Sequence, residues 1–429
     1  MENIIYPPKE TWTGLCKRPL IDVPNLEKPV RLIIHKVKTE GDRALSEYAR
    51  QFDKVELDEI KVSREEIVES ASLVPPKLIK AVETAKKNIE KFHRAQLSET
   101  GVIETMPGVK CWRKNVPVEK VGLYIPGGSA PLFSTVLMLG IPAKIAGCRR
   151  IIICTPPDHN GRINPLVLFA ASLTGITEVY KTGGAQAVAA MAYGTETIPR
   201  VNKIFGPGNQ YVTMAKEIVQ SEGIAIDMPA GPSEVLVIAD NSADPSFVAS
   251  DLLSQAEHGP DSQVVLLTDS RELMDSVKNE IDRQLQALPR KSIAGHSLLN
   301  SLSILFADTG ECMEFSNKYA PEHLIINTKD ADRLAQKVVN AGSVFIGRYS
   351  CESAGDYASG PNHTLPTNGF ASTFSGVSVD SFLKKITFQD LSWEGLEKIG
   401  PLVEAMAEAE GLEGHRNAVS IRLKSRKNV

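Results

Sequence analysis

The feature of this sequence that most constrains its fold is a series of nine short apolar runs that begins at residue 121. Each run has four to seven apolar-rich residues and ends at Gly, Pro, Asp or Asn, as buried strands do. Helical patterns such as PLFSTVLMLGIPAKIAG and AQAVAAMAYG lie between many of the runs. This order of strand and helix predicts parallel sheets with helices on both faces. The runs are VGLYIP, RRIIICTPP, EVYKTGG, KIFGPGN, SEVLVIAD, SQVVLLTD, SILFAD, HLIINT and SVFIG.

A proline-rich segment divides these runs into two groups. IDMPAGPSE, at residues 226–234, lies between the fourth run and the fifth. A chain of 429 residues is also too long for one core, because single cores stop growing at roughly 250 to 300 residues. We therefore expect two separate α/β units rather than one nine-stranded sheet.

The two ends of the chain carry helical patterns instead. The first 120 residues look helical, with amphipathic stretches at 28–52 and 66–96. Pro75 and Pro76 are expected to break the second stretch into two helices. After Phe382 the pattern predicts helix again, at EGLEKIGPLVEAMAEAEGL.

Composition and charge exclude several classes of protein. The apolar fraction of 42% and the charged fraction of 23% are those of a globular protein. The 48 basic and 52 acidic residues are spread along the chain, so we expect no nucleic-acid partner. The opening residues lack the basic and apolar regions of a signal peptide, and no apolar run is long enough for a membrane helix. These observations predict a cytoplasmic protein with no membrane partner.

The cysteines show no CxxC spacing, and most lie in apolar or strand-like surroundings. We expect buried reduced thiols, with a single catalytic thiol as the alternative. The six are Cys16, Cys111, Cys148, Cys154, Cys312 and Cys351.

Four polar stretches hold half of the eight histidines. In SQAEHGPDSQ, a helix from about Pro245 to His258 would place Gln255 and His258 on one face, just before a Gly-Pro stop. The helix dipole alone also favours a histidine in a last helical turn. Taken alone, this stretch can therefore be explained without a role for His258 as a ligand.

The second stretch, YAPEHLIINT, has adjacent Glu322 and His323 at the entrance to a strand. Neighbouring residues in a strand point to opposite faces of the sheet. Both side chains could serve one site only if the backbone bends there.

The third stretch, residues 355–367, holds Asp356 and His363 and is expected to be a long loop, because Gly, Ser, Pro and Asn are frequent in it. The fourth carries Glu410 and His415 into the C-terminal tail. Nitrogen and oxygen donors from these stretches would meet the count of a tetrahedral zinc site without cysteine.

Glycine-rich turns suggest a phosphate-binding role. YIPGGSAPLFS, KTGGAQAVAA and FGPGNQYV place glycines between a strand and a helix start, where free backbone N–H groups can meet phosphate. None has the G-x-G-x-x-G spacing, and helix-capping glycines would look the same.

Seven segments, taken in order, resemble the histidinol dehydrogenase family, the NAD-dependent enzymes that end histidine biosynthesis. The resemblance covers nearly the whole chain, and seven segments are more specific than any one motif. The segments are GLYIPGGSAPLFSTVLMLGIPAKIAG, IFGPGNQYV, DMPAGPSEVLVIAD, DLLSQAEHGPDSQ, YAPEHL, GDYASGPNHTLPT and EGLEGHRNAVSIR.

The resemblance implies an α/β fold with two incomplete Rossmann-like parallel-sheet domains plus small helical N- and C-terminal segments. The implied limits are an N-terminal segment at 1–22, a first domain at 23–125 with 235–377, an NAD-associated domain at 126–234 and a tail at 378–429. The family forms an intertwined homodimer in which the tail histidine reaches the zinc of the partner.

The resemblance also implies an activity and a set of site residues. The family oxidises L-histidinol to L-histidine by two hydride transfers to NAD, through an aldehyde that stays bound. One zinc ion per subunit holds the substrate. The zinc ligands fall on Gln255, His258, Asp356 and His415, and the two bases on Glu322 and His323. The zinc ligands and His323 also contact the substrate, together with Ser233, His363 and Glu410. The NAD residues fall on Tyr124, Gln186 and Asn209.

General chemistry fits these assignments. An imidazole titrates near neutral pH, which suits His323 as the base for an alcohol proton. Glu322 could activate the water that hydrates the aldehyde. The imidazole and amine of histidinol are both zinc donors.

Three alternatives stay open. The first is an aldehyde dehydrogenase-like enzyme with a cysteine nucleophile, for which Cys351 is the one tempting candidate. The second is a zinc hydrolase, in which a metal, a Glu and a His activate water. The third is a non-catalytic protein with structural zinc, although such sites are usually rich in cysteine.

Overall fold

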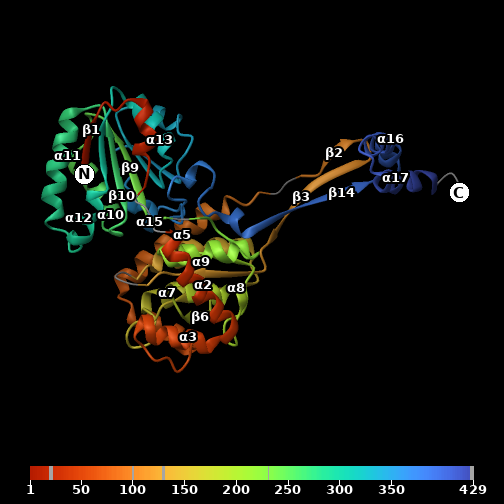
Figure 1. The fold of residues 1–429 in the computed structure, drawn as a ribbon, viewed down its shortest axis with the longest axis horizontal. Helices are drawn as coiled ribbons and strands as arrows, with labels where there is room; N and C mark the ends of the chain where they lie inside the picture. Colours follow the sequence, from red (N-terminus) through yellow and green to blue (C-terminus); the bar gives the residue numbers. More distant parts are fainter. Residues whose placement is uncertain (19–22, 99–100, 128–130, 230, 426–429) are drawn as a thin grey trace. The chain divides into compact units, whose positions relative to one another are not determined.

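The computed structural model describes residues 1–18, 23–98, 101–127, 131–229 and 231–425. Its contacts divide the chain into two compact units. We call them the large unit (Met1–Gln96 with Val118–Phe382) and the hairpin unit (Leu97–Pro117 with Leu383–Val429). The large unit contains two parallel sheets, and the hairpin unit contains one antiparallel sheet (Figure 1).

The first sheet of the large unit has six parallel strands in the order β1-β11-β10-β9-β12-β13. Its strands are β1 (Glu2–Ile5), β9 (Glu234–Ala239), β10 (Gln263–Thr268), β11 (Leu302–Leu305), β12 (His323–Asn327) and β13 (Ser343–Ile346). Every residue of β9, β10 and β12 is buried, as expected for a sheet covered on both faces.

Two separate cores cover the faces of this sheet. Val235 and Val237 of β9 point into a core made with α10 (Pro245–Ala256), α11 (Arg271–Leu285) and α12 (Lys291–Leu299). The alternate residues Leu236 and Ile238 point into a core made with α13 (Thr309–Tyr319), α14 (Ala331–Ala335) and Trp12 of α1 (Trp12–Leu15). The alternation of side chains along a strand therefore supplies both cores.

The second sheet has five parallel strands in the order β6-β5-β4-β7-β8. Its strands are β4 (Lys120–Tyr124), β5 (Arg150–Thr155), β6 (Glu178–Lys181), β7 (Lys203–Phe205) and β8 (Ala225–Ile226). The helices between them are α6 (Phe133–Ala146), α7 (Pro165–Leu173), α8 (Gly184–Tyr193) and α9 (Gln210–Ser221). All nine predicted strands are thus present, and the chain changes sheets at the predicted proline-rich break.

Most of the N-terminal helices pack against the helices that cover the five-stranded sheet. Helix α2 (Val23–Glu40) packs on α8 and α9 through Val30 and Ile34. Helices α3 (Asp42–Tyr48), α4 (Arg64–Glu69) and α5 (Pro76–Arg94) follow, and the break before α5 falls at the two expected prolines. The domain limits implied by the family stay a prediction, although β4 and α2 share a core with residues 126–234.

The hairpin unit contains strands that the sequence did not predict. β14 (Leu383–Leu391), β3 (Val109–Pro117) and β2 (Ile103–Met106) form an antiparallel sheet in that order, and α16 (Trp393–Ala409) and α17 (Glu413–Ser425) follow it. The expectation of helix throughout the first 120 residues was therefore wrong at β1, β2 and β3, and β14 precedes the expected C-terminal helix. Nearly all residues of these strands are exposed or half-buried and many are polar, so no apolar run marked them.

We predict that Gly206→Ala destabilises the large unit. Gly206 follows β7 with φ +127°, and a Cβ atom there would lie 2.1 Å from the carbonyl oxygen of Tyr124. Gly223 has a similar φ of +97° but open space around it, so Gly223→Ala is a matched control. We expect a loss of about 3 kcal/mol or more for the first variant and about 1 kcal/mol for the second, measured by chemical unfolding. Equal losses would mean that the contact with Tyr124 does not limit this position.

Candidate active site

The two predicted bases meet at one residue of the neighbouring strand. The Oε2 atom of Glu322 accepts a hydrogen bond from the backbone N–H of Glu234 at 2.9 Å. The Nδ1 atom of His323 lies 3.2 Å from the carbonyl oxygen of Glu234 and 3.6 Å from Glu322 Oε2. Glu322 lies in a backbone bend just before β12, which begins at His323, so the structure has the bend that the sequence required. The two neighbouring side chains can therefore reach one place.

The other nitrogen of His323 faces an acidic pair on a short helix. Its Nε2 atom lies 3.4 Å from Oδ1 of Asp356, and Glu352 completes a group whose possible metal-binding atoms all lie within 4.8 Å of one another. Glu352 and Asp356 both belong to α15 (Glu352–Tyr357), where a spacing of four residues places them on one face.

The position of Asp356 corrects one expectation from the sequence. Residues 355–367 were expected to form a loop, but Gly355 to Tyr357 form the last turn of α15. Glycine fits there because a Cβ atom on Gly355 would lie 2.6 Å from the ring of Phe345. Glu352 was missed because the helix was not predicted. The spacing of Glu352 and Asp356 was the available signal.

Gln255 and His258 approach each other at the carboxyl end of α10. The Nε2 atom of Gln255 lies 3.2 Å from Nδ1 of His258. Helix α10 ends at Ala256, so His258 lies just beyond it rather than inside it. The Oε1 atom of Gln255 is buried and has no hydrogen-bond partner among the described residues. A buried oxygen of this kind is an available ligand atom.

Burial and neighbouring charges set the protonation of the cluster. Burial raises the pKa of Glu322 to about 8 and raises that of Glu352 well above its usual range. Burial alone would lower the pKa of His323, but Glu352, Glu322 and Asp356 raise it well above its usual range. Asp356 has a lowered pKa, because the effect of its burial is outweighed by that of the facing His323.

Burial lowers the pKa of both His258 and His363, so the neutral imidazole is favoured in each. His363 is held on two sides: its Nδ1 lies 2.9 Å from the carbonyl oxygen of Asp356, and its Nε2 lies 3.1 Å from Oγ1 of Thr135 in α6. A cavity of about 220 Å³ is lined by His258, Ser233 and Asn209. This cavity brings together one residue from each of the predicted zinc, substrate and NAD sets.

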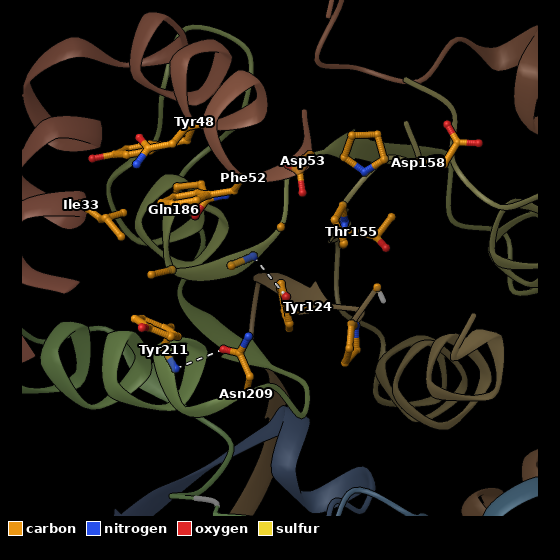
Figure 2. A pocket seen from close by; sticks show the side chains of 18 of the residues that line it. Ile33, Tyr48, Phe52, Asp53, Tyr124, Thr155, Asp158, Gln186, Asn209 and Tyr211 are labelled. Atoms are coloured by element: carbon orange, nitrogen blue, oxygen red, sulfur yellow. Dashed lines mark hydrogen bonds between the residues drawn. The ribbon is translucent and has the colours of Figure 1, made fainter. Parts of the chain in front are cut away.

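A larger cavity of about 1080 Å³ lies at the carboxyl ends of the strands of the five-stranded sheet (Figure 2). All three predicted NAD residues line it: Tyr124 ends β4, Gln186 lies in α8, and Asn209 caps α9. The hydroxyl of Tyr124 accepts a hydrogen bond from the backbone N–H of Gly184 at 3.1 Å. The side chain of Asn209 accepts from the N–H groups of Tyr211 and Val212, so it also has a structural role.

The sequence did not identify the opposite wall of this cavity. Tyr48 and Phe52 stack there with ring centroids 5.4 Å apart, and burial raises the pKa of the adjacent Asp53 to about 6. These residues lie in and after α3, far along the chain from the glycine-rich turns.

Two predicted site residues belong to the hairpin unit. Glu410 follows α16, and His415 lies in the first turn of α17. Their contribution to the site of the large unit stays a prediction.

The expected state of the cysteines is confirmed in part. All six lie within the described ranges and are free thiols. Cys148, Cys154 and Cys312 are buried, and burial raises the pKa of each thiol. Cys351 is half-buried and precedes α15.

Comparisons with known proteins agree with this arrangement. The family model for histidinol dehydrogenase matches residues 16–423. Histidinol dehydrogenases from Bacteroides thetaiotaomicron and Bacteroides fragilis are 57% and 58% identical, over 100% and 99% of both chains respectively. The crystal structure of histidinol dehydrogenase from Elizabethkingia anophelis superposes with a TM-score of 0.97 at 55% identity, covering 100% of this chain and 99% of the other.

Two parallel sheets, a cluster of buried acids and imidazoles, and a cavity at the ends of parallel strands are together typical of an α/β enzyme. The matches define the class of enzyme more closely, as an oxidoreductase. The chain belongs to the histidinol dehydrogenase family, the enzymes of histidine biosynthesis that the sequence resemblance had indicated. No helix in the described ranges has the length and apolar character needed to cross a bilayer.

We predict that Glu322→Gln stabilises the metal-free protein increasingly as the pH rises. The carboxyl of Glu322 has a pKa of about 8 in the folded protein, against an ordinary value of 4.5. The folded protein therefore loses stability as the pH rises from the lower value to the higher one. The side-chain amide of the Glu322→Gln variant does not ionise, so this loss of stability is absent from the variant. Its oxygen can still accept the hydrogen bond from the backbone N–H of Glu234. We expect a gain of several degrees in thermal midpoint above about pH 8 and little gain near about pH 5. The exposed Glu65→Gln is the control, and a gain that does not depend on pH would contradict this protonation.

Proposed function

We propose that the protein oxidises L-histidinol to L-histidine in two successive steps, through a bound aldehyde, with NAD and one zinc ion per subunit. The observation that carries the proposal is the meeting of Glu322 and His323 at Glu234, with Nε2 of His323 facing Asp356 at 3.4 Å. Two bases at one place suit a reaction that removes protons from an alcohol and then from a hydrate.

Despite its burial, the carboxylates around His323 raise its pKa well above the usual range in the metal-free protein, which favours the protonated ring. With the charge of Asp356 offset by a bound metal ion, the pKa would fall, and the neutral His323 would take the hydroxyl proton of the substrate. A carbonyl oxygen can only accept, so the contact with Glu234 favours a proton on Nδ1 and leaves Nε2 as the nitrogen that exchanges its proton. Nε2 points toward the acidic face of α15, where the substrate would bind.

Glu322 would activate the water that adds to the aldehyde. A pKa of about 8 lies near neutral pH, where a carboxyl can both take up and return a proton. Burial excludes bulk water, so the added water would enter by way of the site itself.

Gln255, His258 and Asp356 offer donor atoms of the kinds that zinc accepts. The unpartnered Oε1 of Gln255, the neutral His258 and the ionised Asp356 would hold it, with His415 as the fourth ligand. Zinc, when bound, would supply a fixed positive centre for the imidazole and amine of the substrate. Ser233, His363 and Glu410 would contact the rest of the substrate.

The cavity at the five-stranded sheet has the size and position for NAD. Its volume of about 1080 Å³ suits a dinucleotide, and helices α8 and α9 begin at its edge, where the positive ends of their dipoles favour phosphate. NAD, when bound, would accept the hydride of each oxidation. Tyr124, Gln186 and Asn209 would position it.

A homodimer in which His415 serves the partner is also part of the proposal. Large apolar side chains of the hairpin unit are exposed in the single chain, which is typical of a surface that another chain covers. They include Ile386, Phe388 and Leu391 of β14 and Leu402 and Met406 of α16. The cytoplasmic location stays a prediction as well.

The first test is the number of NADH molecules formed per L-histidinol by zinc-loaded protein with excess NAD. We expect a ratio near two, lost on chelation, and a turnover at least about 100-fold lower for His323→Ala. Cys351→Ala should keep the activity, because this mechanism uses no thiol. A loss in that variant would favour the aldehyde dehydrogenase-like reading. A ratio near one would contradict the role of Glu322, and no NADH at all would favour a hydrolase.

The predicted zinc ligands can also be tested by a measurement that does not depend on turnover. Gln255→Ala and His258→Ala should each weaken zinc binding by at least about 10-fold, measured as retained zinc after dialysis against graded chelator. His296→Ala, an exposed histidine on α12, is the control. Wild-type retention in both site variants would show that the ligands lie elsewhere.

A further inference from the structure

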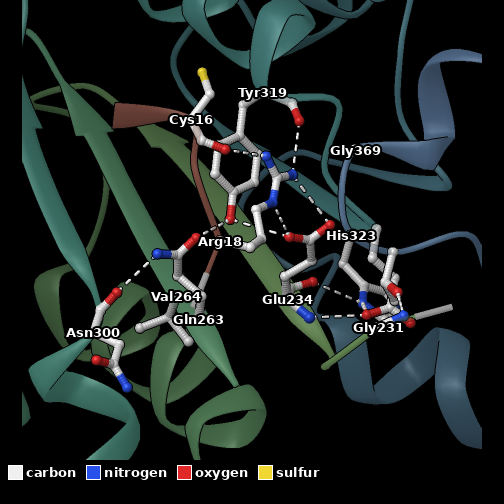
Figure 3. Close-up of polar contacts among 12 residues, drawn as sticks. Cys16, Arg18, Gly231, Glu234, Gln263, Val264, Asn300, Tyr319, His323 and Gly369 are labelled. Atoms are coloured by element: carbon white, nitrogen blue, oxygen red, sulfur yellow. Dashed lines mark hydrogen bonds and ion pairs between the residues drawn. The ribbon is translucent and has the colours of Figure 1, made fainter. Parts of the chain in front are cut away.

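Behind the two bases lies a buried polar network that begins in the N-terminal segment (Figure 3). The Nε atom of Arg18 donates to Oε2 of Glu234 at 2.7 Å, and Nη2 donates to Oε1 at 3.2 Å. The two side chains are only 7% and 1% exposed, so water does not screen this pair. A bidentate pair between a guanidinium and a carboxylate fixes direction as well as distance.

Further contacts hold the guanidinium of Arg18. Nη1 donates to the carbonyl oxygen of Cys16 and Nη2 to that of Tyr319, both at 2.7 Å. The guanidinium also lies 3.4 Å from the centre of the Tyr319 ring. The hydroxyl of Tyr319 lies 3.1 Å from Oε2 of Glu234 and 2.7 Å from Oε1 of Gln263. Arg18 and Glu234 are thus held from several sides.

Glu234 connects this network to the predicted bases. Its side chain binds Arg18, while its backbone N–H and carbonyl oxygen contact Glu322 and His323. A shift of Glu234 would move the partner atom of both bases at once. The ion pair joins residues 216 positions apart, so the N-terminal segment reaches the centre of the sheet.

We propose that Arg18 is a positioning residue that sets the geometry of Glu322 and His323 through Glu234. This inference rests on the proposed function, because it takes these two residues as the bases. A buried ion pair contributes little net stability compared with apolar residues of the same shape, whereas it specifies one arrangement of the groups around it. The ion pair of Arg18 and Glu234 lies next to the two bases, whose placement matters for turnover.

Arg18→Lys tests the geometry while it keeps the positive charge. Lysine cannot form the two-pronged contact, so the Glu234 backbone would lose its fixed position. A displacement of about 1 Å can lower turnover by the order of 100-fold. In the zinc-loaded full-length protein we expect kcat to fall by about 10-fold to 100-fold, with the KM for NAD unchanged, because the NAD cavity lies at the other sheet.

Lys216→Met is the matched control. Lys216 forms a buried ion pair with Asp227 in the part of the large unit that holds the five-stranded sheet, with side chains 5% and 1% exposed. It contacts neither base, so we expect lower thermal stability without the fall in kcat caused by loss of positioning. Glu234→Gln, which also breaks the charge pair, is the second variant if Arg18→Lys folds poorly.

The decisive measurement is a double-mutant cycle on kcat with Glu322→Gln. If Arg18 acts through the bases, Arg18→Lys should cost at least 5-fold less in the Glu322→Gln background than in the wild type. Additive losses, or an unchanged kcat in folded Arg18→Lys protein, would overturn the inference. Glu322→Gln and His323→Ala, each measured alone, test the proposed function separately. Wild-type turnover in both variants would show that these two residues are not the bases, although the network around Arg18 would still be intact.

Discussion

A buried charge at the start of the central strand organises the large unit. Glu234 begins β9 with its side chain 1% exposed, and a carboxylate removed from water in this way must have a partner. Arg18 supplies that partner, and Tyr319 adds a hydroxyl and a ring. Because β9 pairs with both β10 and β12, what fixes Glu234 also fixes the entrance to the strand that carries His323.

The large cavity and the acidic cluster lie at opposite ends of the strands of their respective sheets. The large cavity lies at the carboxyl ends of β4 and β6, where helices begin, and the positive ends of helix dipoles favour a phosphate there. The acidic cluster lies instead at the amino end of β12, beside the carboxyl end of α10. Helix carboxyl ends favour cations, which suits a metal ion and an amine. The polarity of a strand–helix–strand chain thus separates a side whose helix dipoles favour anions from a side whose helix dipoles favour cations.

The sequence predicted the strongly patterned parts of the fold. Nine strands and the change of sheet at residues 226–234 could be read from apolar runs and prolines, because burial on both faces of most of these strands leaves a continuous apolar signal. The strands of the hairpin unit carry no such signal, since nearly all of their residues are exposed or half-buried. Helix α15 was missed because Gly355, which packs on Phe345, looked like a loop residue. Four polar stretches marked candidate site positions, and family resemblance assigned their roles. Glu352 had a local signal in its spacing from Asp356, whereas Arg18 could be found only from contacts between distant segments.

The position of β1 also affects the order in which this chain can be completed during synthesis. Strand β1 lies at the sheet edge beside β11, with Glu2 paired to Leu302, so β1 must wait for some 300 further residues to be synthesised before it can pair. The helices and strands of the five-stranded sheet, whose partners are nearer in sequence, can assemble well before that. Nascent chains would therefore form the large cavity before the six-stranded sheet can close.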